Sequence, residues 1–117
     1  MTLKTAPTFN VDIHMAGDIA LAGQVIQRYA VENGICVTLS PQSFIYTGGR
    51  EEGFRVGFIN YPRFPAEHGN DIWAKAMTLA GSLMVELGQH SYSIVTPIET
   101  TWVSRRPDDA LLSKAGA

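Results

Sequence analysis

The chain of 117 residues carries a net charge of −2, with 45% hydrophobic and 17% charged residues. This length fits one domain and this composition supports a packed core, so we expect a single domain over residues 1–117, with its core at about 8–105 and a flexible tail over 106–117. The absence of a basic run argues against nucleic acid as a partner.

The sequence also bears on location and assembly. No stretch approaches the roughly 18 consecutive apolar residues of a membrane span, and the opening MTLKTAPTFN lacks the apolar segment of a signal peptide. We therefore expect a cytoplasmic protein. The single cysteine, Cys36, excludes an intrachain disulfide and fits a reducing compartment. So few charges suggest that another subunit covers part of the surface, and we expect a homo-oligomer, for which a two-fold homodimer is the commonest form.

The first two expected elements are a strand and a helix. In TFNVDIHM, residues 8–15, apolar and polar side chains alternate, which is typical of a half-buried strand. Residues 17–34 then place apolar side chains at helical spacing. We expect Asp18 to cap this helix and Gly34 to end it in the left-handed conformation. Gly23 within it would allow close packing against a sheet.

A long hairpin follows. Residues 35–47 and 54–61 are predicted as its two strands, joined by a glycine-rich turn over GGREEG, residues 48–53. Pro41 has no N–H to donate, so the ladder should show a bulge, a bend or a sheet edge there.

The segment INYPRFPAEHGNDIW connects the hairpin to a second helix. We expect Asn70 or Asp71 to cap this helix, which then runs to Gly88. Two short strands, 91–97 and 100–105, complete the chain.

The order of these elements predicts an α+β fold. It is the βαββαβ pattern of a ferredoxin-like two-layer sandwich with an extra C-terminal strand, in which two helices cover one face of an antiparallel sheet. The other face stays open and mixes polar groups with aromatic area, which suits a dimer interface or a ligand cleft beside one. The expected open-face residues are Asn10, Asp12, His14, Cys36, Thr38, Ser40, Arg55, Gly57 and Trp102.

No decisive catalytic, metal or nucleotide motif is present. YTGGREEG lacks the lysine and the following helix of a phosphate-binding loop, so it is predicted as a hairpin loop. Its glycine N–H groups, together with Arg50 or Arg55, could still hold an anion. Glu67, His68 and Asp71 are close enough in sequence to hold a metal, but loop and helix-cap chemistry explains the same residues. We predict no metal and no cofactor.

The prolines of YPRFP make the connecting segment stiff. Pro62 and Pro65 fix the backbone, and the residues that precede them, Tyr61 and Phe64, are driven to extended conformations. The aromatic residues either cap the core or form, with Arg63, a platform for a planar base and a phosphate or for a protein partner.

These features lead to three functional hypotheses. The first is a non-enzymatic protein that sequesters or senses a small anionic ligand such as a nucleotide. The second is a protein–protein inhibitor or adaptor, such as a small phage or mobile-element protein that neutralises a host factor through the open sheet face. The third is a small enzyme with Asp12 and His14 as an acid–base pair, although the sequence favours no catalysis. The predicted ligand-binding residues are Tyr46, Gly48, Gly49, Arg50, Arg55, Tyr61, Arg63 and Trp102.

Overall fold

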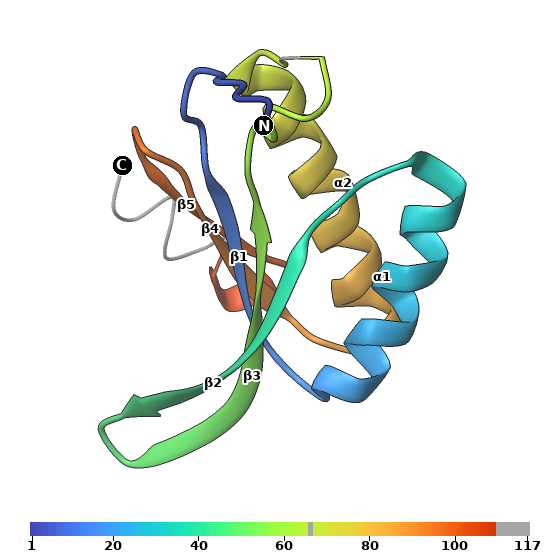
Figure 1. The fold of residues 1–117 in the computed structure, drawn as a ribbon. Helices are drawn as coiled ribbons and strands as arrows, with labels where there is room; N and C mark the ends of the chain where they lie inside the picture. Colours follow the sequence, from blue (N-terminus) through green and yellow to red (C-terminus); the bar gives the residue numbers. More distant parts are fainter. Residues whose placement is uncertain (66, 110–117) are drawn as a thin grey trace.

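The computed structural model describes residues 1–65 and 67–109 of the chain. Five strands form one sheet in the order β2-β3-β1-β4-β5, and every neighbouring pair is antiparallel. Both helices lie on the same face of this sheet (Figure 1). The predicted α+β two-layer fold is therefore confirmed. The elements are β1 (Val11–Ala16), α1 (Ile19–Asn33), β2 (Thr38–Tyr46), β3 (Gly49–Phe58), α2 (Gly69–Glu86), β4 (Ser91–Val95) and β5 (Thr100–Ser104).

The core lies between the sheet and the two helices. Alternate residues of β1, Val11, Ile13 and Met15, are buried, while the residues between them are half-buried. From α2, Leu79 and Leu83 are fully buried against them. Buried apolar residues thus recur every second position in the strand and every three to four positions in the helix, so each element has one apolar face, and the two layers pack through these faces. No helix in the described part of the chain is long and apolar enough to cross a membrane.

The ends of α1 are as expected, and the start of α2 is not. The carboxylate of Asp18 accepts a hydrogen bond from the N–H of Ala20 at 2.8 Å, and Gly34 ends α1 with φ 65°. The prediction that Asn70 or Asp71 caps α2 is wrong, because the helix begins at Gly69 and its N-cap position is His68. Asp71 instead lies in the first turn, where its negative charge interacts favourably with the positive end of the helix dipole.

The hairpin of β2 and β3 is longer than expected. Residues 49–53 belong to β3 and pair with residues 42–46, so the prediction of a turn over 48–53 is wrong. The turn is tight, and Gly48 adopts a φ of 91° there, in the region that favours glycine. The hairpin projects well beyond the helices (Figure 1). Pro41 pairs with Phe54 and lies in β2, which is an edge strand of the sheet. Of the predicted bulge, bend or sheet edge at Pro41, the structure shows the sheet edge.

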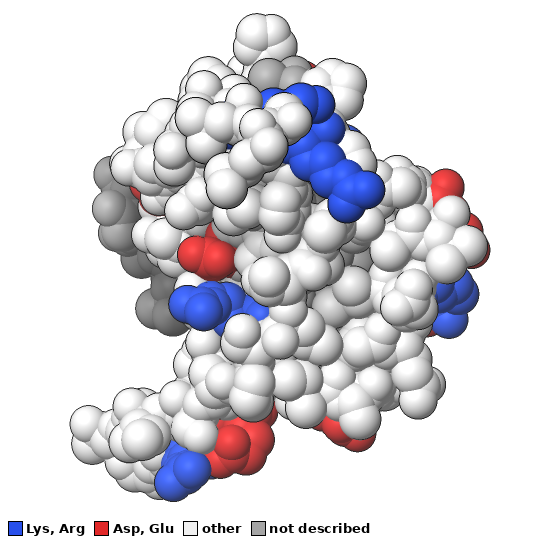
Figure 2. Space-filling model, in the orientation of Figure 1, with Lys and Arg blue, Asp and Glu red and all other residues white. Residues whose placement is uncertain are grey.

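The register places polar side chains in a row across the open face. His14 in β1 pairs with Arg55 in β3 and with Ser93 in β4. Ser40 in β2 and Trp102 in β5 extend this row, because Arg55 pairs with Ser40 and Ser93 pairs with Trp102. The predicted phases of these strands are therefore confirmed. In the view of Figure 2, basic and acidic residues are scattered over the surface and no large patch of one sign is seen.

Candidate active site

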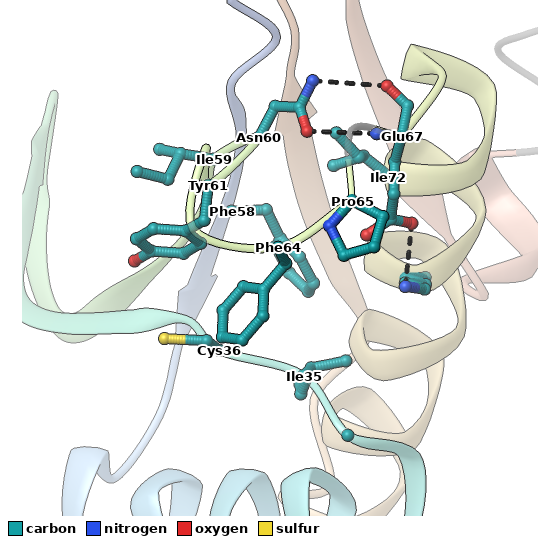
Figure 3. A pocket seen from close by; sticks show the side chains of 12 residues that line it. Ile35, Cys36, Phe58, Ile59, Asn60, Tyr61, Phe64, Pro65, Glu67 and Ile72 are labelled. Carbon is teal, nitrogen blue, oxygen red and sulfur yellow. Dashed lines mark hydrogen bonds and ion pairs between the residues drawn. The ribbon is translucent and has the colours of Figure 1, made fainter. Parts of the chain in front are cut away.

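A pocket of about 380 Å³ lies where the chain leaves β3. We call the connecting residues 59–65 the elbow and this hollow the elbow pocket (Figure 3). It opens between the elbow, the approach to β2 and the first turns of α2, and its volume is within the usual range for small-molecule sites. The lining residues are Gly34, Ile35, Cys36, Phe58, Ile59, Asn60, Tyr61, Phe64, Pro65, Glu67, Ile72 and Lys75.

A turn shapes the elbow. The N–H of Phe64 donates to the carbonyl of Tyr61 at 3.1 Å, with Pro62 at the second position, where its fixed φ favours a turn. The rings of Tyr61 and Phe64 stand edge to face, with centroids 6.5 Å apart and planes at 84°. The guanidinium of Arg63 lies 5.8 Å from the centre of the Phe64 ring. The turn therefore holds two aromatic rings together at the pocket.

The pocket walls are largely apolar. Phe58 and Ile72 are buried, at 4% and 3% exposure, and form part of the hydrophobic core. Ile35 packs against that core from the approach to β2. Phe64 keeps 53% of its surface exposed and so remains available for contact with a ligand. An apolar wall that merges with the core gives this site a firm base.

One charged pair lines the pocket. The Nζ of Lys75 donates to the carboxylate of Glu67 at 2.8 Å, and both side chains are partly exposed. The side-chain amide of Asn60 holds the backbone of Glu67 through two hydrogen bonds. Glu67 is thus a fixed carboxylate at the edge of an otherwise apolar hollow.

The Tyr61 hydroxyl is a second polar group of the elbow pocket. Desolvation raises the pKa of Tyr61 above its ordinary value, and a hydrogen bond with the Cys36 thiol raises it further. Tyr61 is therefore a neutral group that can donate its O–H. Cys36 is itself exposed and lines the same pocket.

The structure divides the eight predicted ligand-binding residues among several places. Gly48, Gly49 and Arg50 lie at the tip of the hairpin, where Arg50 pairs with Glu52 at 3.0 Å. The tip and the elbow are at opposite ends of β3, about 30 Å apart at the usual rise of a strand. The predicted residues at the hairpin tip therefore do not share a site with those at the elbow.

The remaining predicted residues lie at the elbow or on the open face. Tyr61 lines the elbow pocket, and the exposed Arg63 follows it. Arg55 is exposed in the middle of the open face. Tyr46 and Trp102 come together there, in a second hollow of about 270 Å³ that His14 also lines.

His14 and Asp12, the acid–base pair of the third hypothesis, lie on the open face and do not line the elbow pocket. The Nδ1 of His14 is 3.0 Å from the side-chain nitrogen of Gln42. As for a metal site, no group of three or more His, Cys, Asp or Glu side chains that could hold an ion occurs within residues 1–65 and 67–109.

Of the twelve residues that line the elbow pocket, the sequence placed only Tyr61 in the predicted ligand site, and it did not single out Lys75 or Asn60 for any role. Lys75 reaches Glu67 from the second turn of α2, and Asn60 reaches both Pro7 and Glu67. An asparagine next to a proline-rich turn is a local signal for side-chain bonds to backbone, but its partners depend on the fold.

No protein-family model and no curated protein sequence matches the chain. Two solved structures of a phage SAM lyase do match by fold. The form in complex with S-methyl-5′-thioadenosine has a TM-score of 0.67 and 13% sequence identity, and the alignment covers 89% of this chain and 95% of the lyase chain. The apo form has a TM-score of 0.64 and 14% identity, with 84% and 90% covered.

This similarity corrects the functional hypotheses. The prediction of a non-enzymatic protein, whether a ligand binder or an inhibitor, is contradicted because the matching solved structures are those of an enzyme. The ligand of that enzyme is a small molecule, the nucleoside thioether S-methyl-5′-thioadenosine, which carries no phosphate. Over nearly its whole length, the chain has the fold of a phage lyase.

Proposed function

We propose that this protein is a lyase that cleaves S-adenosylmethionine and releases S-methyl-5′-thioadenosine. The observation that carries the proposal is the fold match, which covers 95% of the phage SAM lyase chain. The elbow pocket supports it, because its volume of about 380 Å³ suits a nucleoside-sized ligand. The match also supports a phage origin for the chain.

The two molecules define the bond that breaks. S-methyl-5′-thioadenosine keeps the adenosyl group, the sulfur and the methyl of S-adenosylmethionine, so cleavage falls between the sulfur and the γ-carbon of the methionine chain. The electrons of that bond stay on sulfur, which changes from a sulfonium cation to a neutral thioether. As that bond breaks, either the carboxylate of the methionine chain attacks the γ-carbon and closes a lactone, or the β-carbon loses a proton to solvent and an alkene forms.

An apolar pocket favours this loss of charge. The sulfonium is charged in the substrate and neutral in the product, so surroundings of low polarity destabilise the substrate relative to the transition state. Phe58, Ile72 and Ile35 provide such surroundings in the elbow pocket. The exposed ring of Phe64 and the ring of Tyr61 offer faces for stacking the adenine or for contact with the sulfonium.

Glu67 supplies the one carboxylate among the pocket residues that the structure describes. In this proposal it binds a positive or hydroxyl-bearing part of the substrate, either the amino group of the methionine chain or the ribose. The ammonium of Lys75 lies 2.8 Å from that carboxylate. Tyr61, neutral and hydrogen-bonded to Cys36, offers a phenolic oxygen that can accept a hydrogen bond from the substrate at the same elbow.

The test is direct conversion of S-adenosylmethionine by the purified protein. The products are separated by liquid chromatography and identified by mass spectrometry, with the rate in buffer alone subtracted. We expect S-methyl-5′-thioadenosine to appear in proportion to protein concentration and time. Nuclear magnetic resonance of the mixture identifies the four-carbon product.

Two controls sharpen the assay. S-adenosylhomocysteine lacks the methyl group and the sulfonium charge, so it should not react. Glu67→Gln keeps the size of the side chain and removes its charge, so it should react more slowly than the wild type. A folded wild-type protein that forms no S-methyl-5′-thioadenosine above the buffer rate would contradict the proposed function.

A further inference from the structure

The side chain of Asn60 joins three separate parts of the chain beside the elbow pocket. Its Nδ2 donates to the carbonyl of Pro7 at 3.0 Å and to the carbonyl of Glu67 at 3.3 Å, and its Oδ1 accepts from the N–H of Glu67 at 3.2 Å. We call these three hydrogen bonds the Asn60 clamp. Figure 3 shows the two that reach Glu67.

The chemistry of the clamp requires an amide of this length. Both N–H groups of Asn60 and its oxygen are used, so the side chain pairs with both backbone polar groups of Glu67 as a neighbouring strand would. A carboxylate at this position would accept from the N–H of Glu67 but would face two carbonyl oxygens without a proton. An apolar side chain would supply none of the three bonds.

The clamp also ties the elbow to the segment that precedes β1. Pro7 accepts from Asn60, and the ring of Phe9 lies so close to Gly69 that a Cβ there would come within 2.6 Å of it. The start of α2, the end of β3 and residues 7–9 are therefore packed together. Glu67 lies just before α2, so this packing fixes where its backbone lies.

The ion pair with Lys75 is not sufficient to place the Glu67 carboxylate. Both side chains are partly exposed, at 42% for Lys75 and 38% for Glu67, and exposed pairs are weak and screened by salt. The backbone of Glu67 must be fixed independently for its side chain to keep one position. Among the described contacts, the Asn60 clamp provides two hydrogen bonds to that backbone.

We propose that Asn60 is a positioning residue for the cleavage of S-adenosylmethionine, and that it acts by holding Glu67 at the edge of the elbow pocket. This inference rests on the proposed function. Small misplacements of a contacting group reduce rates strongly, so Asn60→Ala should lower kcat/KM by about tenfold to a hundredfold. Asn60→Asp, which keeps the size but loses both donors, should lower it in the same direction.

The kinetic test is a double-mutant cycle with Glu67→Gln. If Asn60 acts through Glu67, then adding Asn60→Ala to the Glu67→Gln variant should change kcat/KM by less than about threefold. A purely structural role would give the same loss in both backgrounds, which would overturn the proposal. The matched control is Asn33→Ala, since the Asn33 side chain donates to the carbonyl of Tyr29 on α1, outside the pocket. That control should keep wild-type kinetics.

Amide hydrogen exchange provides a second readout that does not depend on activity. The N–H of Glu67 donates to Asn60, so it should exchange about tenfold faster in Asn60→Ala while the core amides of β1 stay protected. Equal exchange of the Glu67 amide in both proteins would overturn the clamp. An active wild type with a fully active Asn60→Ala would overturn the positioning role alone. A wild type that makes no S-methyl-5′-thioadenosine would instead overturn the proposed function, and the positioning role with it.

Discussion

The ammonium of Lys75, on the second turn of α2, lies 2.8 Å from the carboxylate of Glu67, which precedes that helix at the edge of the elbow pocket. Glu67 places one negative charge beside an apolar and aromatic pocket, and the positive charge of Lys75 neutralises it. In the proposed reaction, the cationic substrate would meet this carboxylate at the edge of the pocket.

Removing the charge of Glu67 should impair function and leave stability nearly unchanged. A hydrogen bond to a charged group contributes roughly 1.5–3 kcal/mol, so Glu67→Gln should lower kcat/KM by about tenfold to a hundredfold. Its exposed pair with Lys75 is worth no more than about 1 kcal/mol, so the melting temperature should change little. Steady-state kinetics and thermal unfolding measure the two effects.

The chain offers a matched control for that substitution. Glu86 forms an exposed pair with Arg28, and neither residue lines the elbow pocket. Glu86→Gln makes the same chemical change and should leave kcat/KM at the wild-type value. Equal kinetic losses in the two variants would contradict a specific role for Glu67.

Cys36 provides a chemical probe of the pocket, because it is exposed on the wall and is the single cysteine of the chain. Alkylation with iodoacetamide should block turnover, since the added group would fill part of the hollow. S-methyl-5′-thioadenosine at about ten times its Kd leaves roughly a tenth of the sites free, so it should slow alkylation about tenfold.

Cys36→Ser is the control for this probe. It should stay active and become insensitive to iodoacetamide, because a serine does not react with the reagent. If alkylation of the wild type proceeds at the same rate with and without S-methyl-5′-thioadenosine, the ligand does not occupy the elbow pocket.

The pKa of Tyr61 predicts a specific pH dependence. Desolvation and the Cys36 thiol raise this pKa above 10.0, so the folded protein binds the phenolic proton more tightly than the unfolded chain does. The stabilisation is complete below the unfolded pKa of about 10 and is lost as the pH rises through the folded value. The ultraviolet titration of the wild type minus that of Tyr61→Phe should place this tyrosine above the ordinary value.

The same titration tests the cause of the shift. Cys36→Ala removes the hydrogen-bond partner, so the pKa of Tyr61 should move down toward 10.0. A Tyr61 that ionises below its ordinary value would contradict the neutral donor assigned to it.

Two glycines should respond in opposite directions to the same substitution. A Cβ at Gly53 would lie 2.3 Å from the carbonyl oxygen of Met15, in the middle of the sheet, so Gly53→Ala should destabilise the fold by about 1–3 kcal/mol. A Cβ at Gly81 in α2 would meet nothing within 4 Å, so Gly81→Ala should stabilise it by about 0.4–1 kcal/mol. Chemical denaturation measures both free energies, and a stable Gly53→Ala would contradict the close approach of β1 and β3.

Much of the fold could be predicted because its signals are local. The alternation through Val11, Ile13 and Met15 identified β1 and its buried face, and Asp18 and Gly34 marked the ends of α1. Each of these features depends on residues within a few positions of one another, through side-chain periodicity or a capping hydrogen bond. The order of the elements then restricts the two-layer topologies that the chain can adopt to a small number.

The errors came from contacts between distant segments. Gly49 and Gly53 of the predicted turn belong to β3, and Gly53 lies close to the backbone of Met15 and the ring of Phe44. The start of α2 shifted to Gly69, which packs against Phe9. In both cases the close approach of a residue far away in the sequence leaves no room for a Cβ at the glycine.

The sequence by itself determined the order of the elements and the two layers, since these follow from side-chain periodicity. The tertiary structure alone decided which groups share a site. It separated Arg50 at the hairpin tip from Tyr61 at the elbow, although the sequence had suggested one ligand site for both. It also brought the Asn60 side chain to Pro7, 53 positions away. Contacts between such distant residues depend on how β3 and α2 pack, and no local sequence pattern predicts them.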